Sequence, residues 1–220
     1  MANYYGTPTI VTDGLVFAVD AGNGQSYVSG SLDTFSLVSS NTGSFSSTGM
    51  YDSGNQKTWY FDGVGDAIEF NDVSFNSSGF SISCWFNSAT FSEQNAIIGS
   101  VNDVSPVWVG WYYKTYGGAN KLFWYDGSGK EFDFGTLSIN TWYNLVAVCN
   151  SDTLTGYLNN VNTGSLSATY DGVFNYMGGP GGWGGINDFE GKIANVYIYN
   201  RALSAAEVNQ NYNATKNRFI

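Results

Sequence analysis

The stretch Phe80-Ser-Ile-Ser-Cys-Trp-Phe86 shows most clearly which kind of fold this chain forms. Its apolar residues stand at positions 80, 82, 84 and 86, and this strict alternation is typical of a β-strand with one buried face. The pattern places Cys84 on the buried face. There we expect it to serve as a small hydrophobic residue and not as a reactive thiol.

Further apolar runs of strand length follow at short intervals. Pairs such as Gly-Gly, Asp-Gly and Asn-Asn separate several of them and suit tight turns between antiparallel strands. We expect residues 63–66 to close a hairpin between strands 57–62 and 67–70, and residues 29–56 to form a long loop with one or two weak strands. The other expected strands span 15–19, 80–86, 96–100, 107–114, 121–126, 130–134, 141–149 and 153–159. Such spacing indicates an all-β sandwich or barrel.

One short helix is expected near the C-terminus. Ser204-Ala-Ala-Glu207 is a capping box, in which the serine hydroxyl and the glutamate each satisfy a free amide of the first turn. We expect this helix to run to about Tyr212 and, because it is short, to pack on the edge of the sandwich.

The composition excludes several classes of function. A length of 220 residues suggests one domain, and the absence of histidine removes every mechanism that needs an imidazole. The net charge of −10 argues against a nucleic-acid partner. No apolar run approaches the roughly 20 residues that span a bilayer, and the first residues lack a signal-peptide pattern. We therefore expect no membrane insertion and synthesis in the host cytoplasm without a signal peptide. Cys84 and Cys149 are too few for a disulfide framework.

Five blocks of sequence together resemble laminin-G-like domains of the concanavalin A-like lectin/glucanase superfamily. They are Trp59-Tyr-Phe-Asp-Gly-Val-Gly-Asp-Ala-Ile68, Phe80–Phe86, Asn140-Thr-Trp-Tyr-Asn-Leu-Val146, Gly156-Tyr-Leu-Asn-Asn160, and Phe189 through Val196-Tyr-Ile-Tyr-Asn-Arg-Ala-Leu-Ser-Ala-Ala-Glu207. The resemblance implies an all-β, two-sheet antiparallel jelly-roll sandwich with one short C-terminal helix. It covers residues 13–213 and leaves 1–12 as an N-terminal extension and 214–220 as a C-terminal tail.

The two ends of the chain are similar to laminin-G-like proteins of tailed bacteriophages. The similarity rests on Val11-Thr-Asp-Gly-Leu-Val16 with Asp20-Ala-Gly-Asn23, and on Asn200-Arg-Ala-Leu-Ser204 with Asn211-Tyr-Asn-Ala-Thr-Lys-Asn-Arg218. This resemblance implies a non-enzymatic structural, decoration or fibre-type protein located in the virion. Such a protein would associate with itself as a homo-oligomer and dock on other virion proteins.

Catalysis is not expected. Glucanases of the superfamily carry two Glu and an Asp on one strand, where alternate residues share a face and flank the scissile bond. The nearest match here is Glu131-Phe-Asp133-Phe-Gly135-Thr136, which lacks the last glutamate. We therefore interpret Glu131 and Asp133 as the polar face of a strand, opposite Phe132 and Phe134.

A structural calcium ion is left open, and no cofactor is required. Laminin-G-like folds often bind Ca²⁺ at a rim, with two aspartates in the closing strand. Ala194 and Asn195 stand at those positions here, which weakens that site. The remaining acidic candidates lie near turns, where aspartate also serves simply as a turn residue: Asp20, Asp62, Asp66 and Asp188.

Two aromatic groups are candidates for binding a glycan or a partner. Gly178-Gly-Pro-Gly-Gly-Trp183-Gly-Gly185 either displays Trp183 beside Asn187 and Asp188, or folds Trp183 back over the sandwich mouth. The second group includes Trp108 and Tyr112. Because both faces of this strand are aromatic, one face must be core, and the other is covered by residues 29–56, by a sugar or by another subunit. Subunit burial is the favoured interpretation. The alternative function is a carbohydrate-binding adhesin that recognises a host-surface glycan.

Overall fold

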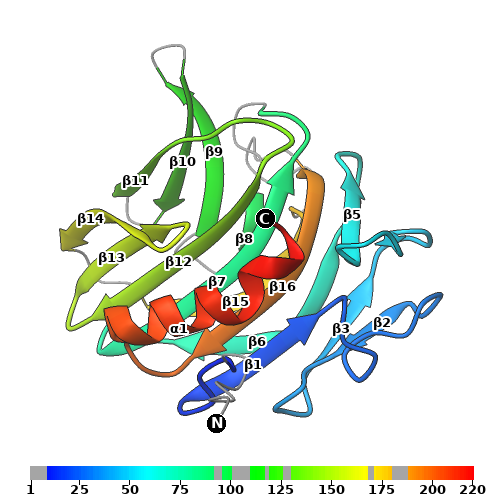
Figure 1. Cartoon of the computed structure of the whole chain (residues 1–220), viewed down its shortest axis with the longest axis horizontal. Coiled ribbons are helices and arrows are strands. Elements are labelled where there is room, and N and C mark those ends of the chain that lie inside the picture. The colour runs from blue at the N-terminus through cyan, green and yellow to red at the C-terminus, as the bar shows by residue number, and fades with distance from the viewer. Residues whose placement is uncertain are drawn as a thin grey trace, which may run out of the picture.

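A computed structural model describes residues 9–91, 96–100, 110–116, 119–125, 130–167, 171–179 and 188–220. Two antiparallel sheets of eight strands each lie face to face, which confirms the predicted all-β jelly-roll sandwich with one short C-terminal helix (Figure 1). In the described ranges, no helix has the length and apolar character needed to cross a membrane.

Sheet A carries the strand with which the sequence analysis began. Its order is β14 (Val161–Ser167), β13 (Thr153–Leu158), β12 (Trp142–Asn150), β7 (Gly79–Ser88), β16 (Glu190–Tyr199), β5 (Thr58–Asp62) and β4 (Tyr51–Asp52), and β1 (Leu15–Asp20) also pairs with β16. Sheet B has the order β11 (Glu131–Thr136), β10 (Ala119–Tyr125), β9 (Gly110–Tyr116), β8 (Ala96–Gly99), β15 (Gly172–Met177), β6 (Ile68–Phe75), β3 (Thr42–Phe45) and β2 (Asp33–Phe35).

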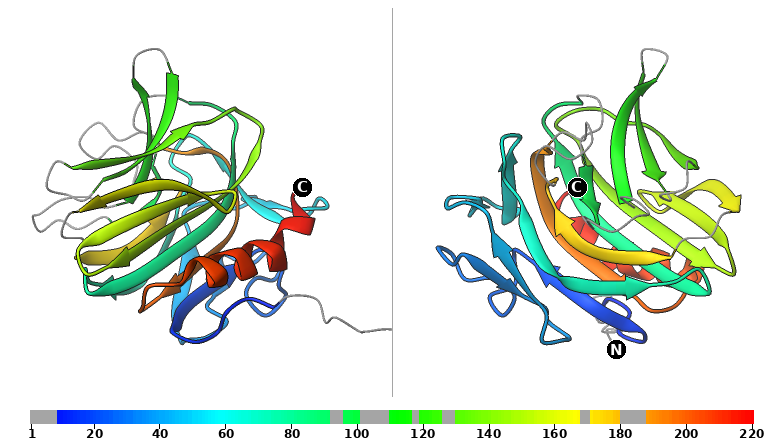
Figure 2. Two further views of the ribbon diagram at one scale, coloured as in Figure 1. Left: turned by 60° about the vertical axis from the view of Figure 1, so that its left-hand side comes forward. Right: turned by 180° about the vertical axis from the view of Figure 1, so that it is seen from behind.

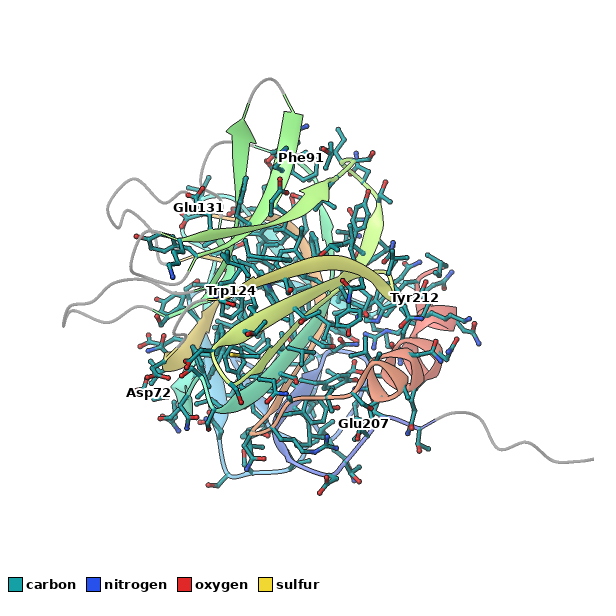
Figure 3. The ribbon with its side chains drawn as sticks, turned by 90° about the vertical axis from the view of Figure 1, so that its left-hand side faces the viewer. Asp72, Phe91, Trp124, Glu131, Glu207 and Tyr212 are labelled. Carbon is teal, nitrogen blue, oxygen red and sulfur yellow. The ribbon has the colours of Figure 1, made fainter. Side chains whose placement is uncertain are left out.

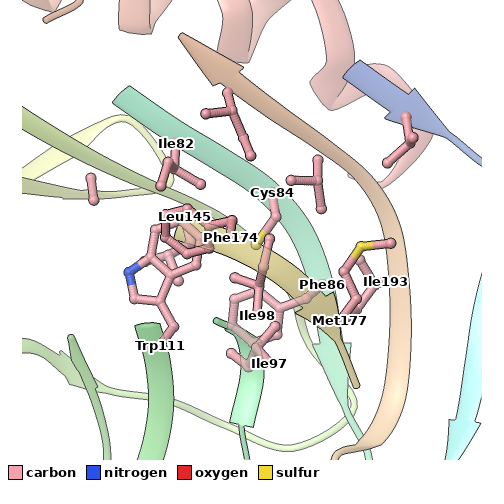
Figure 4. Packing of buried hydrophobic residues seen from close by; sticks show 14 of the residues in the cluster. Ile82, Cys84, Phe86, Ile97, Ile98, Trp111, Leu145, Phe174, Met177 and Ile193 are labelled. Atoms are coloured by element: carbon pink, nitrogen blue, oxygen red, sulfur yellow. The ribbon is translucent and has the colours of Figure 1, made fainter. Parts of the chain in front are cut away.

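The core lies between the two sheets and follows the predicted alternation of β7. Phe80, Ile82, Cys84 and Phe86 are completely buried. In Figure 4 the Cys84 side chain lies among apolar side chains that come from both sheets. Burial raises the pKa of the Cys84 thiol far above its usual range, as expected for a packing residue.

The predicted hairpin around residues 63–66 is wrong. β5 pairs with β16 and β4 in sheet A, whereas β6 pairs with β15 and β3 in sheet B, so residues 63–66 cross from one sheet to the other. The period of two correctly identifies the core-facing residues on each strand, but it carries no information about which strand is the partner. Residues 29–56, expected to be mostly loop, contain the three short strands β2, β3 and β4.

The outer face of sheet A is covered by α1 (Ala205–Thr215) and the 3-10 turn η1 (Lys216–Arg218) (Figure 1). The capping box forms as predicted: the Ser204 hydroxyl accepts from the Glu207 amide, and the Ser204 amide donates to the Glu207 carboxylate at 2.8 Å. The helix continues three residues beyond the expected end at Tyr212 because Thr215 and the following turn still pack on the sheet.

Residues of the expected terminal extension and tail pack on the sandwich. The Phe219 ring stacks on Trp85 with 4.5 Å between ring centroids, and Arg218 forms an ion pair with Asp20. At the other end, the Val11 amide donates to Asn211 Oδ1 at 2.7 Å, and the Tyr199 hydroxyl donates to the Val11 carbonyl at 3.0 Å.

Candidate functional site

The outer face of sheet B, which points away from sheet A, is the candidate site. In the described part of the chain no helix lies on it, since α1 packs on the opposite side of the sandwich (Figure 2). In Figure 3, Asp72 and Glu131 lie on one side of the molecule and Glu207 and Tyr212 on the other, with Trp124 between them. Exposed or half-exposed side chains gather on this outer face: Glu69, Asp72, Lys121, Tyr125, Glu131, Asp133 and Tyr176.

The middle of this face combines one aromatic ring with two carboxylates. Tyr176 on β15 pairs across the sheet with Glu69 on β6. Asp188, two residues before the start of β16, accepts a hydrogen bond from the Gly65 amide at 2.7 Å. Phe189, the residue after Asp188, donates its amide to the carbonyl of Gly178 at 2.7 Å, two residues after Tyr176. Burial raises the pKa of the Tyr176 hydroxyl, and the negative charges of Glu69 and Asp188 raise it further.

The chemistry of this group suits a polyhydroxylated ligand. A tyrosine ring offers a flat apolar surface with a polar tip. An ionised carboxylate only accepts hydrogen bonds, and each of its oxygens can receive a hydroxyl donor. Sugar rings present both an apolar face and outward hydroxyl groups, so Tyr176, Glu69 and Asp188 offer the two kinds of contact that such a ring needs.

Two hydrogen-bonded pairs flank this group along the face. Lys121 Nζ contacts Asp133 Oδ2 at 2.6 Å, and the Gly135 amide donates to Asp133 Oδ1 at 2.7 Å. Asn175 Nδ2 donates to Asp72 Oδ1 at 2.9 Å. The partners hold these polar side chains in fixed positions, which lowers the entropy lost when a ligand binds them.

The predicted aromatic residues are only partly placed. Trp183, Asn187 and Trp108 lie outside the described residues. Tyr112 is described in its backbone alone, which pairs with Ala96 on one side and Phe123 on the other. Its neighbour Trp111 is completely buried in the core.

The sequence leaves residues 29–56 as one alternative for what covers the second face of this aromatic strand, and this alternative is wrong. Residues 29–56 contribute β2 and β3, which extend sheet B at the edge opposite to β9, β10 and β11. They join the sheet as neighbours because β3 pairs with β6 and β2 pairs with β3, and they do not lie over β9. Burial by another subunit stays a prediction.

The four candidate calcium ligands lie at two places in the structure, and each has hydrogen-bond partners in the protein. Asp20 pairs with Asn195 of β16, whereas Asp62 pairs with Glu190 at the start of that strand. Arg218 Nη1 contacts Asp20 Oδ1 at 2.5 Å. Asp66 accepts from the Ser47 hydroxyl and the Asp62 amide, at 2.5 and 3.0 Å. Within the described ranges, no three His, Cys, Asp or Glu side chains come together as a metal site would require.

The two acids of β11 lie as the alternation predicts. Phe132 and Phe134 point into the core, whereas Glu131 and Asp133 are half-exposed on the outer face. Gly135, at a φ of +107°, ends this alternation where a glucanase would carry its further glutamate.

Two residues of the candidate group were not found from the sequence. Glu69 and Tyr176 are more than a hundred positions apart, and only the pairing of β6 with β15 brings them together. The β-branched and aromatic residues Val173, Phe174 and Tyr176 could have indicated strand β15, but the partner strand could not have been read from them.

The family comparison identifies the chain. Residues 61–209 match the family Laminin_G_3, described as the concanavalin A-like lectin/glucanases superfamily. The chain belongs to this family. A search of curated proteins found no match.

Solved structures agree on the fold. A sialidase from Trypanosoma rangeli in complex with sialic acid has a TM-score of 0.70 at 15% identity, over 96% of this chain and 34% of the sialidase. This chain thus spans about a third of that enzyme. Domain 4 of the extracellular arabinanase AbnA from Geobacillus stearothermophilus, in complex with arabinotriose, has a TM-score of 0.61 at 17% identity, over 91% of this chain and 98% of the domain. The binding domain of Paraclostridial Mosquitocidal Protein 1 has a TM-score of 0.58 at 17% identity, over 90% of this chain and 52% of that one.

Proposed function

We propose that this chain is a non-catalytic carbohydrate-binding domain whose binding surface is the outer face of sheet B. The observation that carries the proposal is the group of Tyr176, Glu69 and Asp188. Tyr176 pairs with Glu69 across the sheet, and the amide of the residue after Asp188 bonds to the carbonyl of Gly178, which directly follows β15. The fold shared with domain 4 of an arabinanase, a domain of nearly the same length that was solved with arabinotriose, supports it.

The net negative charge of the chain favours neutral ligands over anionic ones. With a net charge of −10 and two carboxylates at the centre of the group, the surface repels anionic polymers and favours neutral glycans. The acids of β11 do not add a reaction, because Asp133 is held by Lys121 and the Gly135 amide.

Affinity electrophoresis through gels that contain neutral polysaccharides tests the proposal, with arabinan as one of them. We expect at least one polysaccharide to retard the native chain, and Tyr176→Ala and Glu69→Gln to reduce the retardation. Tyr60→Ala is the matched control, because Tyr60 is a 39%-exposed tyrosine on β5 of sheet A. Equal retardation of all three variants, or none for the native chain on any polysaccharide, would remove the proposal.

A second candidate is the structural role in a phage virion, with self-association and docking on other virion proteins. Exposed apolar side chains within residues 28–38 favour it: Val28, Leu32, Phe35 and Val38. Exposed apolar side chains that form a patch mark interaction surfaces. Light scattering of the purified chain and quantitative mass spectrometry of purified particles test this role. A strictly monomeric chain that is absent from particles would exclude it.

A further inference from the structure

A recess at the far edge of sheet B, away from Tyr176, has the form of a small binding pocket. It lies between residues 27–32 and residues 45–51 and encloses about 230 Å³. Ligand pockets for drug-sized molecules usually measure about 300–1,000 Å³, so this recess has room for a smaller ligand.

Aromatic rings form the inner wall of the recess. The Tyr27 ring lies 4.7 Å from Tyr51 and 5.4 Å from Phe45, measured between ring centroids. Behind them, the buried Trp59 ring meets both Tyr27 and Phe45 at 6.3 Å. The indole N–H of Trp59 is buried and has no hydrogen-bond acceptor among the described residues.

The mouth of the recess is polar and open. Ser29, Ser31 and Thr48 bring hydroxyl groups to its rim. The two flanking turns contain Gly30 and Gly49 at φ values of +88° and +87°, and a Cβ added at either would meet no atom within 4 Å. Access to the aromatic wall is therefore not blocked by these turns.

The uncharged lining indicates which class of ligand the recess favours. Among the described residues that line the recess there is no charged side chain. This lining favours a neutral ligand that offers an apolar face to the rings and hydroxyl groups to the serine and threonine side chains. One pyranose or furanose ring has these properties and suits the small volume.

We propose that this recess binds a single neutral sugar ring, as a second site separate from the outer-face group at Tyr176. The class of ligand rests on the proposed function, but the location does not. A domain with both sites would bind a polysaccharide along sheet B and a single terminal or side-chain sugar at its edge, which raises the overall affinity for branched glycans.

Nuclear magnetic resonance of the ¹⁵N-labelled full chain tests the proposal, with the Trp59 indole N–H as the reporter. The probes are L-arabinose, D-galactose, D-glucose and N-acetyl-D-glucosamine, each titrated to millimolar concentrations. We expect a saturable shift of the Trp59 signal with at least one sugar. Tyr51→Ala removes one half-buried ring of the wall and should weaken this binding about fivefold to tenfold.

Three further variants make the result decisive. Thr48→Trp places a large side chain at the exposed mouth and should abolish the shift, whereas Tyr60→Ala should leave it unchanged. Tyr176→Ala should also leave it unchanged while reducing retardation by polysaccharides, so the two sites can fail separately. No saturable shift with any of the four sugars, or an equal shift in Thr48→Trp, would overturn the proposal.

Discussion

Replacement of Phe219 by alanine should destabilise the whole domain, although it changes the residue next to the C-terminal position of the chain. The Phe219 side chain is 8% exposed, stacks on Trp85 at 4.5 Å and meets Trp142 at 4.7 Å. Its ring closes the aromatic cluster that α1 and η1 form on the outer face of sheet A.

The size of the effect follows from this packing. Truncation of a buried phenylalanine to alanine costs about 3–5 kcal/mol. The Phe219 ring lies on the outer surface of the sheet, where neighbouring side chains can move into the space left behind, so we expect a cost at or just below the low end of that range, about 2–3 kcal/mol. For a domain of this length each kcal/mol lowers Tm by about 2–4 °C, which gives a decrease of about 5–10 °C.

Thermal unfolding followed by near-UV circular dichroism measures this decrease, and the fluorescence of Trp85 and Trp142 should shift to the red. Ile220→Ala is the matched control, because Ile220 is 67% exposed and its truncation should change stability by no more than about 0.5 kcal/mol. If Phe219→Ala and Ile220→Ala melt at the same temperature, the last residues do not hold the helix on the sheet and the reasoning is refuted.

Three further predictions concern the helix cap, a tight glycine and metal binding. Glu207 bonds to Arg201 and caps α1, and these contacts lower the pKa of its carboxyl from 4.5 to about 2, so its contribution to stability is complete above pH 4.5 and is lost as the pH falls towards 2. Glu207→Gln should cost about 1 kcal/mol of unfolding free energy at pH 7 and flatten the acid dependence of Tm in this range. An acid profile of Tm unchanged by the substitution would contradict this prediction. Gly178→Ala should lower the free energy of unfolding in urea by about 3 kcal/mol or more, because the added Cβ would lie 2.2 Å from the Phe61 ring. Gly65→Ala, at a similar positive φ but in open space, should cost only about 1 kcal/mol. Equal losses in the two variants would refute the packing argument. Because no three acidic side chains of the described residues come together as metal ligands, EDTA should leave Tm unchanged at low protein concentration, and a decrease would show that the chain binds a stabilising metal ion.

The parts of the fold that depend on local pattern could be predicted from the sequence. The alternation at Phe80–Phe86 gave the core face of β7, and the capping box at Ser204 gave the start of α1. The connection at residues 63–66 could not be predicted, because a tight turn signal is the same whether the next strand pairs in the same sheet or enters the other one.

In the candidate site, too, some residues could be predicted from local sequence and others could not. Asp188 was found because it lies beside an unusual glycine-rich segment, whereas Tyr176 and Glu69 meet only through a long-range strand pairing. Asp20 looked like a possible metal ligand in a turn, but its partner Arg218 is 198 residues away and satisfies its charge. Such contacts are fixed by tertiary structure and leave no signal in the neighbouring residues.

A crystal structure of the chain soaked with the neutral oligosaccharide that best competes for the retaining polysaccharide tests the central claim most directly. The account predicts density for a sugar ring on the outer face of sheet B, stacked on Tyr176 with hydroxyl groups at hydrogen-bond distance from Glu69 and Asp188. Density only on sheet A, or an oligosaccharide that binds without contact to Tyr176, would contradict it.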